Sequence, residues 1–263
     1  MRRSRIAGIA WLLAASAAAA APLPVRFAEG STHGFLVLRD ERGAVLARGE
    51  LLQTAEGTRV TKSMTFRFAD GSLYDEHVTF EADGTFALRR YELTQRGRAF
   101  GADTEVALSS DGRYRVKTRK HDEKKDDVYE GRIDLPSDVY NGMIFVVLKS
   151  MRRGVPATIH YVAFTPKPRV IELRMAAAGP QTVTLGDSSR AATHYVLAPH
   201  LGTWLKIGAA LTGRTPPDLD AWFLTDDVPA FVAFRGPMEM GGPPWRIELE
   251  SPRLPVSAAR GPE

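Results

Sequence analysis

The chain of 263 residues contains no cysteine. This absence excludes disulfides and rules out a thiol nucleophile or a thiolate metal site. It also excludes a bacterial lipid anchor, which needs a cysteine directly after a signal sequence. The folded chain must therefore be held together by non-covalent packing.

Long hydrophobic runs are scarce as well. The longest apolar run, IAGIAWLLAASAAAA, follows the basic start MRRSR and precedes PLP. It is shorter than the about 20 residues that cross a bilayer, and a basic start, an apolar stretch and small residues up to Ala21 are typical of a secretory signal peptide. We predict a signal peptide over 1–21 and a mature chain without a transmembrane span. An alanine-rich signal on a large protein without disulfides favours the bacterial periplasm.

The mature chain also lacks an excess of charge of one sign. The full chain has 35 Lys and Arg against 31 Asp and Glu, and three of the arginines lie in the predicted signal peptide. The remaining charges nearly cancel. A nucleic-acid partner, which needs a basic surface on the mature domain, is therefore not predicted.

Recognisable catalytic and metal motifs are missing. There is no GxSxG, and GDSS at 186–189 follows QTVTL without the strand-to-helix context of a nucleophile, so it is interpreted as a hairpin turn. The six histidines form no HxH or HxxxH pair. We predict neither enzymatic activity nor a cofactor. The catalytic alternative is a hydrolase in which Ser188 or Ser189 meets His194.

What the sequence does contain is alternation of polar and apolar residues, with turn residues about every ten positions. GFLVLRDERGAVLARGELL and TRVTKSMTFRF begin this pattern, and it returns after residue 156 in ATIHYVAF and RVIELRM. KHDEKKDD at 120–127 mixes both signs of charge and fits a solvated hairpin tip. No long Pro- or Gly-rich linker divides the chain. The pattern predicts one mainly β, antiparallel domain over 22–263.

One stretch departs from the alternation: PSDVYNGMIFVVLKSM at 136–151. Pro136, Ser137 and Asp138 are typical of a helix start, and Lys149 lies where positive charge favours a helix end. The apolar residues between them occupy every side of a helical wheel, so the helix has to be covered all round. We predict a helix over about 136–151 in the concave face of a curved half-barrel or open barrel. The alternative is that IFVVL forms a strand.

A trial register for the strands around ADGS and EADG places aromatic side chains on one face, with Lys62, Glu76 and Arg90 among them. In this register Glu76 lies opposite Arg90. Charges on an aromatic face have to be paired, hydrated or used. They form either a structural ion pair or the polar end of a site for an otherwise apolar ligand.

The C-terminal stretch TGRTPPDLDAWFLTDDVPAFVAFRGPMEMGG joins a proline-rich turn to an apolar hairpin. Together with the signal peptide, the meander and the apolar helix, its WF-L-TDD-VPAFVAF-GPM pattern resembles uncharacterised periplasmic proteins with a lipoprotein-carrier-like half-barrel. This resemblance implies a strongly curved sheet whose concave side shelters acyl chains.

The leading hypothesis is a periplasmic protein that binds a lipid or another amphiphile between sheet and helix. The alternative is a non-catalytic cell-envelope scaffold that binds an envelope protein through a strand edge or the C-terminal hairpin. For the first hypothesis we predict the following ligand-binding residues: Lys62, Phe66, Tyr74, Glu76, Arg90, Tyr140, Met143 and Phe145.

Overall fold

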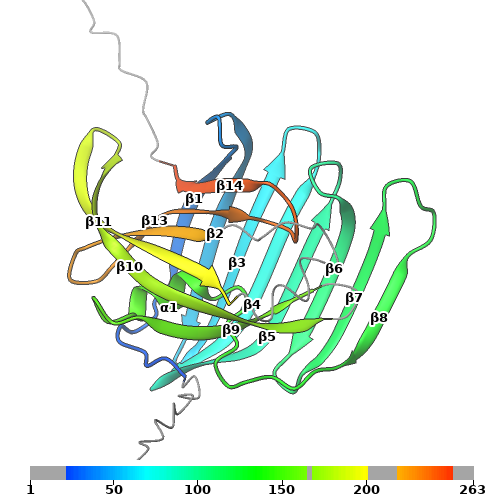
Figure 1. The fold of residues 1–263 in the computed structure, drawn as a ribbon, viewed down its shortest axis with the longest axis horizontal. Coiled ribbons are helices and arrows are strands. Elements are labelled where there is room, and N and C mark those ends of the chain that lie inside the picture. Colours follow the sequence, from blue (N-terminus) through cyan, green and yellow to red (C-terminus); the bar gives the residue numbers. More distant parts are fainter. Residues whose placement is uncertain (1–21, 165–167, 201–217, 251–263) are drawn as a thin grey trace, which may run out of the picture.

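A computed structural model describes residues 22–164, 168–200 and 218–250. The predicted signal peptide lies outside these residues. The described chain is mainly β, as predicted: it forms one antiparallel sheet of 14 strands that is not closed, together with one short helix (Figure 1).

The strands of the first half are β1 (Thr32–Arg39), β2 (Val45–Glu56), β3 (Arg59–Phe68), β4 (Leu73–Asp83), β5 (Thr85–Arg96), β6 (Ala102–Ser109), β7 (Arg113–Lys120) and β8 (Asp127–Arg132). Helix α1 (Ile144–Ser150) follows. The strands of the second half are β9 (Ala157–Ala163), β10 (Arg169–Leu185), β11 (Ser188–Pro199), β12 (Leu219–Leu224), β13 (Phe231–Pro237) and β14 (Pro244–Leu249).

The sheet consists of two antiparallel meanders, which we name the first arm (β1–β8) and the second arm (β9–β14). They join where β1 pairs with β14, in the middle of the order β8-β7-β6-β5-β4-β3-β2-β1-β14-β13-β12-β11-β10-β9. The first and last strands of the described chain are therefore neighbours, and β8 and β9 are the two edges. Hairpin neighbours follow from the local turns, but the pairing of β1 with β14 does not.

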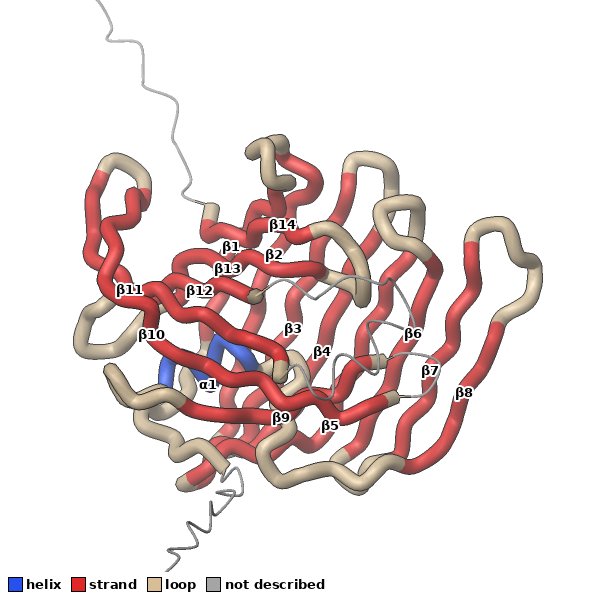
Figure 2. The backbone as a smooth tube through the Cα atoms, in the orientation of Figure 1, coloured by secondary structure: helices blue, strands red, loops and turns tan. Residues whose placement is uncertain are grey.

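The sheet curves so that the second arm lies across from the first (Figures 1 and 2). Residues 133–156, the crossing segment, connect edge strand β8 to edge strand β9 over the concave face. α1 belongs to this segment, and its Val147 and Leu148 share one buried cluster with Phe80 of the first arm and Ile159 of the second. This part of the hydrophobic core thus lies between the two arms of a single sheet.

The predicted helix over 136–151 is too long: α1 spans only Ile144–Ser150. Residues before it run along the outer edge of β9 instead. The backbone of Tyr140 donates to His160 O at 3.0 Å, and the amide side chain of Asn141 pairs with both backbone groups of Val162 at 2.7 and 2.9 Å. Edge strands leave backbone groups unpaired, and this stretch supplies partners for some of those of β9.

The residues that indicate a helix start have other partners. The carboxylate of Asp138, which is fully buried, accepts from Nδ1 of His160 at 2.8 Å rather than capping a helix. Gly142 has a φ of +70°, in the left-handed region that ends regular helix and favours glycine. A Cβ there would lie 3.1 Å from the Cβ of Val78, so Gly142 also allows close passage over β4.

The trial register is also wrong. Glu76 pairs with Leu93, and Arg90 pairs with Thr79. The hairpin starts two residues away from the trial register, since Phe80 pairs with Leu88 rather than Phe86, and the β4–β5 ladder shifts by one further residue between Thr79 and Phe80. A β-bulge inserts one residue and reverses the face of all residues beyond it. Along β5, Phe86 and Leu88 point to the concave side before the bulge, and Tyr91 does so after it. Arg90 is therefore exposed on the convex face.

Three local turn predictions are confirmed, whereas the proline-rich turn predicted at 212–217 lies outside the described residues. GDSS forms the tip of the β10–β11 hairpin, KHDEKKDD joins β7 to β8, and the C-terminal apolar pattern gives the β12–β13 hairpin. None of the helices among the described residues has the length and apolar character needed to span a bilayer.

Candidate ligand-binding cavity

A cavity of about 980 Å³ lies on the concave side between the two arms. This is the upper end of the about 300–1,000 Å³ typical of small-molecule sites. Its wall combines strands of the first arm, the crossing segment, strands of the second arm, and the turn Met238–Gly242 between β13 and β14. Most of the lining is apolar, including Leu93, Val106 and Phe234.

The two arms and the crossing segment meet directly around the cavity. Phe145 of α1 stacks on Phe231 with ring centroids 4.2 Å apart, and Tyr91 stacks on Phe164 at 5.9 Å. The side-chain amide of Gln95 donates to Met238 O at 2.7 Å. These contacts fix the distance between the opposing walls of the cavity and leave the space between the walls unfilled.

Four side chains on the cavity wall form what we name the polar cluster: Lys62 of β3, Tyr74 and Glu76 of β4, and Tyr91 of β5. Each is at most 7% exposed. Oε1 of Glu76 accepts from the hydroxyls of Tyr74 and Tyr91, both at 3.1 Å, and Oε2 lies 3.9 Å from Nζ of Lys62. The trial register places Arg90 opposite Glu76; in the structure the cation beside it is Lys62.

Lys62 connects the cluster to the crossing segment. Its Nζ donates to Gly142 O at 2.6 Å and lies 5.3 Å from the ring centroid of Phe145. Burial lowers the pKa of Lys62, and the charge of Glu76 opposes that shift. The left-handed turn at Gly142 thus brings a backbone carbonyl to an ammonium that would otherwise be poorly solvated.

Burial also raises the pKa of the cluster tyrosines well above its ordinary value, and the neighbouring charge of Glu76 adds to the effect. Both phenols therefore stay protonated as hydrogen-bond donors. Tyr161, across the cavity, has its pKa raised to about 12 by burial.

A third charged group lines the cavity at the β13–β14 turn. Both carboxylate oxygens of Glu239 accept from Gly101 N, at 3.0 and 3.1 Å. Burial raises the pKa of Glu239, and this hydrogen bond together with the nearby His121 partly offsets the rise.

The structure brings five of the eight predicted ligand-binding residues to the cavity wall, namely Lys62, Tyr74, Glu76, Tyr140 and Phe145. Phe66 and Met143 are fully buried in the packed clusters and are not part of the lining. Arg90 lies on the convex face, where its guanidinium pairs with Glu92 at 2.6 Å.

Several lining residues were not predicted. Tyr91 was missed because the bulge could not be located, and Asn141 and Gly142 were missed because they were assigned to a helix. For the turn Met238–Gly242 the sequence gives only a weak indication of a place in the cavity wall: its MEMGG is apolar and glycine-rich, whereas most other turns are polar.

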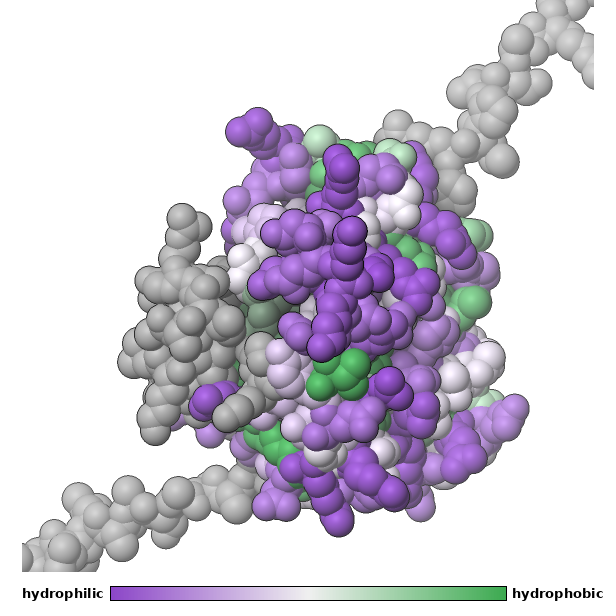
Figure 3. All heavy atoms as spheres, turned by 90° about the vertical axis from the view of Figure 1, so that its right-hand side faces the viewer, coloured by the Kyte–Doolittle hydropathy of each residue, from purple (hydrophilic) through white to green (hydrophobic). Residues whose placement is uncertain are grey.

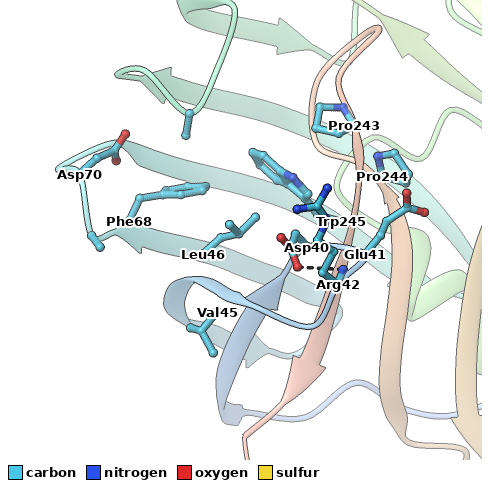
Figure 4. Close-up of a pocket in the computed structure, with 12 residues that line it drawn as sticks. Asp40, Glu41, Arg42, Val45, Leu46, Phe68, Asp70, Pro243, Pro244 and Trp245 are labelled. Atoms are coloured by element: carbon cyan, nitrogen blue, oxygen red, sulfur yellow. Dashed lines mark hydrogen bonds between the residues drawn. The ribbon is translucent and has the colours of Figure 1, made fainter.

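A second, open pocket of about 570 Å³ lies at one end of the sheet, between the β1–β2 turn and Trp245 (Figure 4). Oδ1 of Asp40 accepts from the backbone of Arg42 and Ala44, and Oδ1 of Asp70 accepts from Ser72 N. These carboxylates accept hydrogen bonds within their own turns, so this pocket has fewer polar groups available to a ligand than the cavity.

Neither a metal centre nor the predicted alternative of a hydrolase gains support. The described residues contain no group of three or more potential ligands that could hold a metal ion. Ser189 and His194 lie on the same strand, five residues and roughly 17 Å apart. Nε2 of His194 instead bonds Asp220 at 2.7 Å.

Comparison with known protein families, known proteins and solved structures finds no match for this chain.

Proposed function

We propose that this protein binds a lipid or another amphiphilic small molecule in the cavity between its two arms, and that it does so in the periplasm after removal of residues 1–21. The observation that carries the proposal is a cavity of about 980 Å³ with a mostly apolar wall and one buried polar cluster. Sites of this kind take up the apolar body of a ligand and orient its polar end. The lipoprotein-carrier-like half-barrel expected from the sequence has the same division into a curved sheet and an acyl-binding concavity.

The packing supports a binding role over a plain structural core. Protein interiors are normally filled to crystal-like density, and unfilled space costs stability. Here aromatic contacts among the two arms and the crossing segment surround the space rather than close it. The buried ion pair on its wall is a further cost that a purely structural core would avoid.

The alternative, an envelope scaffold, receives less support. It requires an exposed apolar surface around Trp222 and Phe231, but Phe231 stacks against Phe145 and the ring of Trp222 stacks on His194. Edge strand β8 has five exposed residues out of six, three of them charged, and the molecule viewed from that side is predominantly hydrophilic (Figure 3). Charged edges resist strand addition.

The test is native mass spectrometry of the protein purified gently from the periplasm, followed by solvent extraction and identification of released molecules. Leu93→Trp places a larger ring in the cavity wall, and we expect it to abolish copurification of the ligand. Leu52→Trp, on the convex face and 41% exposed, is the matched control. A ligand-free mass that stays unchanged after incubation with mixed lipids would refute the proposal.

A further inference from the structure

The charged groups on the cavity wall point to the kind of polar head that the ligand carries. Among the described residues, the lining includes three such groups: Lys62, Glu76 and Glu239. Lys62 and Glu76 lie 3.9 Å apart. The pair has no net charge whether the proton stays on the amine or moves to the carboxylate. The cavity as a whole therefore has no excess positive charge for an anionic head.

Each member of the pair also disfavours one kind of ion. A carboxylate or phosphate head placed near Lys62 would lie beside the buried oxygens of Glu76, and like charges in a poorly hydrated site repel strongly. An ammonium head placed near Glu76 would meet Lys62 in the same way. Beside this pair, charged heads of both signs thus lose solvation without a net electrostatic gain.

Hydrogen-bonding capacity in the polar cluster favours an uncharged head. Oε1 of Glu76 already accepts from two tyrosines, whereas no donor of the described chain lies within hydrogen-bond distance of Oε2. An ammonium has three donor protons, and Nζ of Lys62 donates one to Gly142 O. An acceptor and a donor therefore face the same space 3.9 Å apart. A group that both donates and accepts can bond to both.

We propose that the cavity selects amphiphiles whose polar head is a hydroxyl or a primary amide, bound between Nζ of Lys62 and Oε2 of Glu76. This inference rests on the proposed function and specifies its ligand class. Fatty acids and alkylamines of equal chain length are disfavoured.

The test is displacement of the fluorescent apolar probe N-phenylnaphthylamine from the wild-type protein by dodecanol, dodecanoate and dodecylamine at neutral pH. Because the three share one chain, only the head differs. We expect dodecanol to bind at least about tenfold more tightly than either ion, the scale expected for burying a charge without a partner. Equal or tighter binding of dodecanoate or dodecylamine would overturn this inference and leave the proposed function standing. Displacement by none of the three would overturn both.

A charge-changing variant gives an independent result. Glu76→Gln keeps an acceptor for both tyrosines and leaves Lys62 without its carboxylate partner. Because dodecanoate supplies a new carboxylate for Lys62, it should gain at least about tenfold in affinity relative to dodecanol. Glu50→Gln, with a side chain 44% exposed on the convex face, makes the same change of net charge away from the cavity. An unchanged order of preference in Glu76→Gln, with circular dichroism like that of wild type, would contradict the assignment. The wild-type series decides the matter if this variant does not fold.

Discussion

Replacing Lys62 by methionine is the sharpest test of the polar cluster. Methionine has a similar length and no charge, so the change removes the ammonium while keeping most of the apolar contacts. It leaves the carboxylate of Glu76, which is 7% exposed, without its cation and leaves Gly142 O without its donor. Removing one partner of a buried ion pair costs about 3–5 kcal/mol.

Two features place the expected cost at the lower end of that range. The carboxylate keeps the hydrogen bonds from Tyr74 and Tyr91, and the neighbouring cavity gives water access to Oε2. We therefore expect Lys62→Met to lower the free energy of unfolding by about 3 kcal/mol. Combining it with Glu76→Gln removes the unpaired charge, so the double variant should lose only about 1 kcal/mol.

The assay is urea unfolding followed by far-ultraviolet circular dichroism. The control is Lys117→Met, which breaks an ion pair to Asp126 between side chains 36% and 33% exposed and should cost at most about 1 kcal/mol. A loss below about 1 kcal/mol for Lys62→Met, or additive losses in the double variant, would show that the two groups are not energetically coupled.

Three further predictions test the crossing segment and the buried phenols. Gly142→Ala should destabilise the protein by at least about 1–2 kcal/mol in urea unfolding, because the residue has a φ of +70° and a Cβ would crowd Val78; wild-type stability would contradict this conformation. Asn141→Ala should cost about 1–3 kcal/mol and speed amide exchange at Val162, since it removes both hydrogen bonds to that backbone; unchanged exchange there would refute the pairing. In alkaline titration followed by tyrosinate absorbance, phenols with raised pKa should not ionise near the ordinary value of about 10. The pKa of these phenols is higher in the folded than in the unfolded protein. Their contribution to stability is therefore complete below about pH 10 and is lost as the pH rises through the folded pKa, so unfolding should accompany their ionisation. Ordinary titration of all phenols in a folded protein would contradict the burial of Tyr74, Tyr91, Tyr140 and Tyr161.

Local patterns in the sequence determined much of the fold. Alternation and turn residues depend on neighbours a few positions apart, which is why the hairpins at 120–127 and 186–189 could be predicted. The same alternation assigned Lys62, Tyr74 and Glu76 to one face of β3 and β4, because that face is set by the two-residue period of a strand.

Other features were decided only by the tertiary structure. The extra residue Arg89 of β5, opposite the step from Thr79 to Phe80, moved Arg90 to the convex face and brought Tyr91 inward, because a single extra residue reverses every later side chain. The start of α1 was decided by the unpaired edge of β9, since Asp138 and Asn141 gain partners there that no local helix offers.

The cavity itself depends on pairings between distant parts of the chain. The residue types around it, an apolar strand face and a few isolated charges, were fixed by the sequence. The pairing of β1 with β14 joins the arms and gives the sheet its two opposing walls, and the crossing segment then carries Gly142 O to Lys62. Such contacts are selected by the total packing of the folded chain rather than by local preference, so the sequence could supply the chemistry of the site but not its assembly.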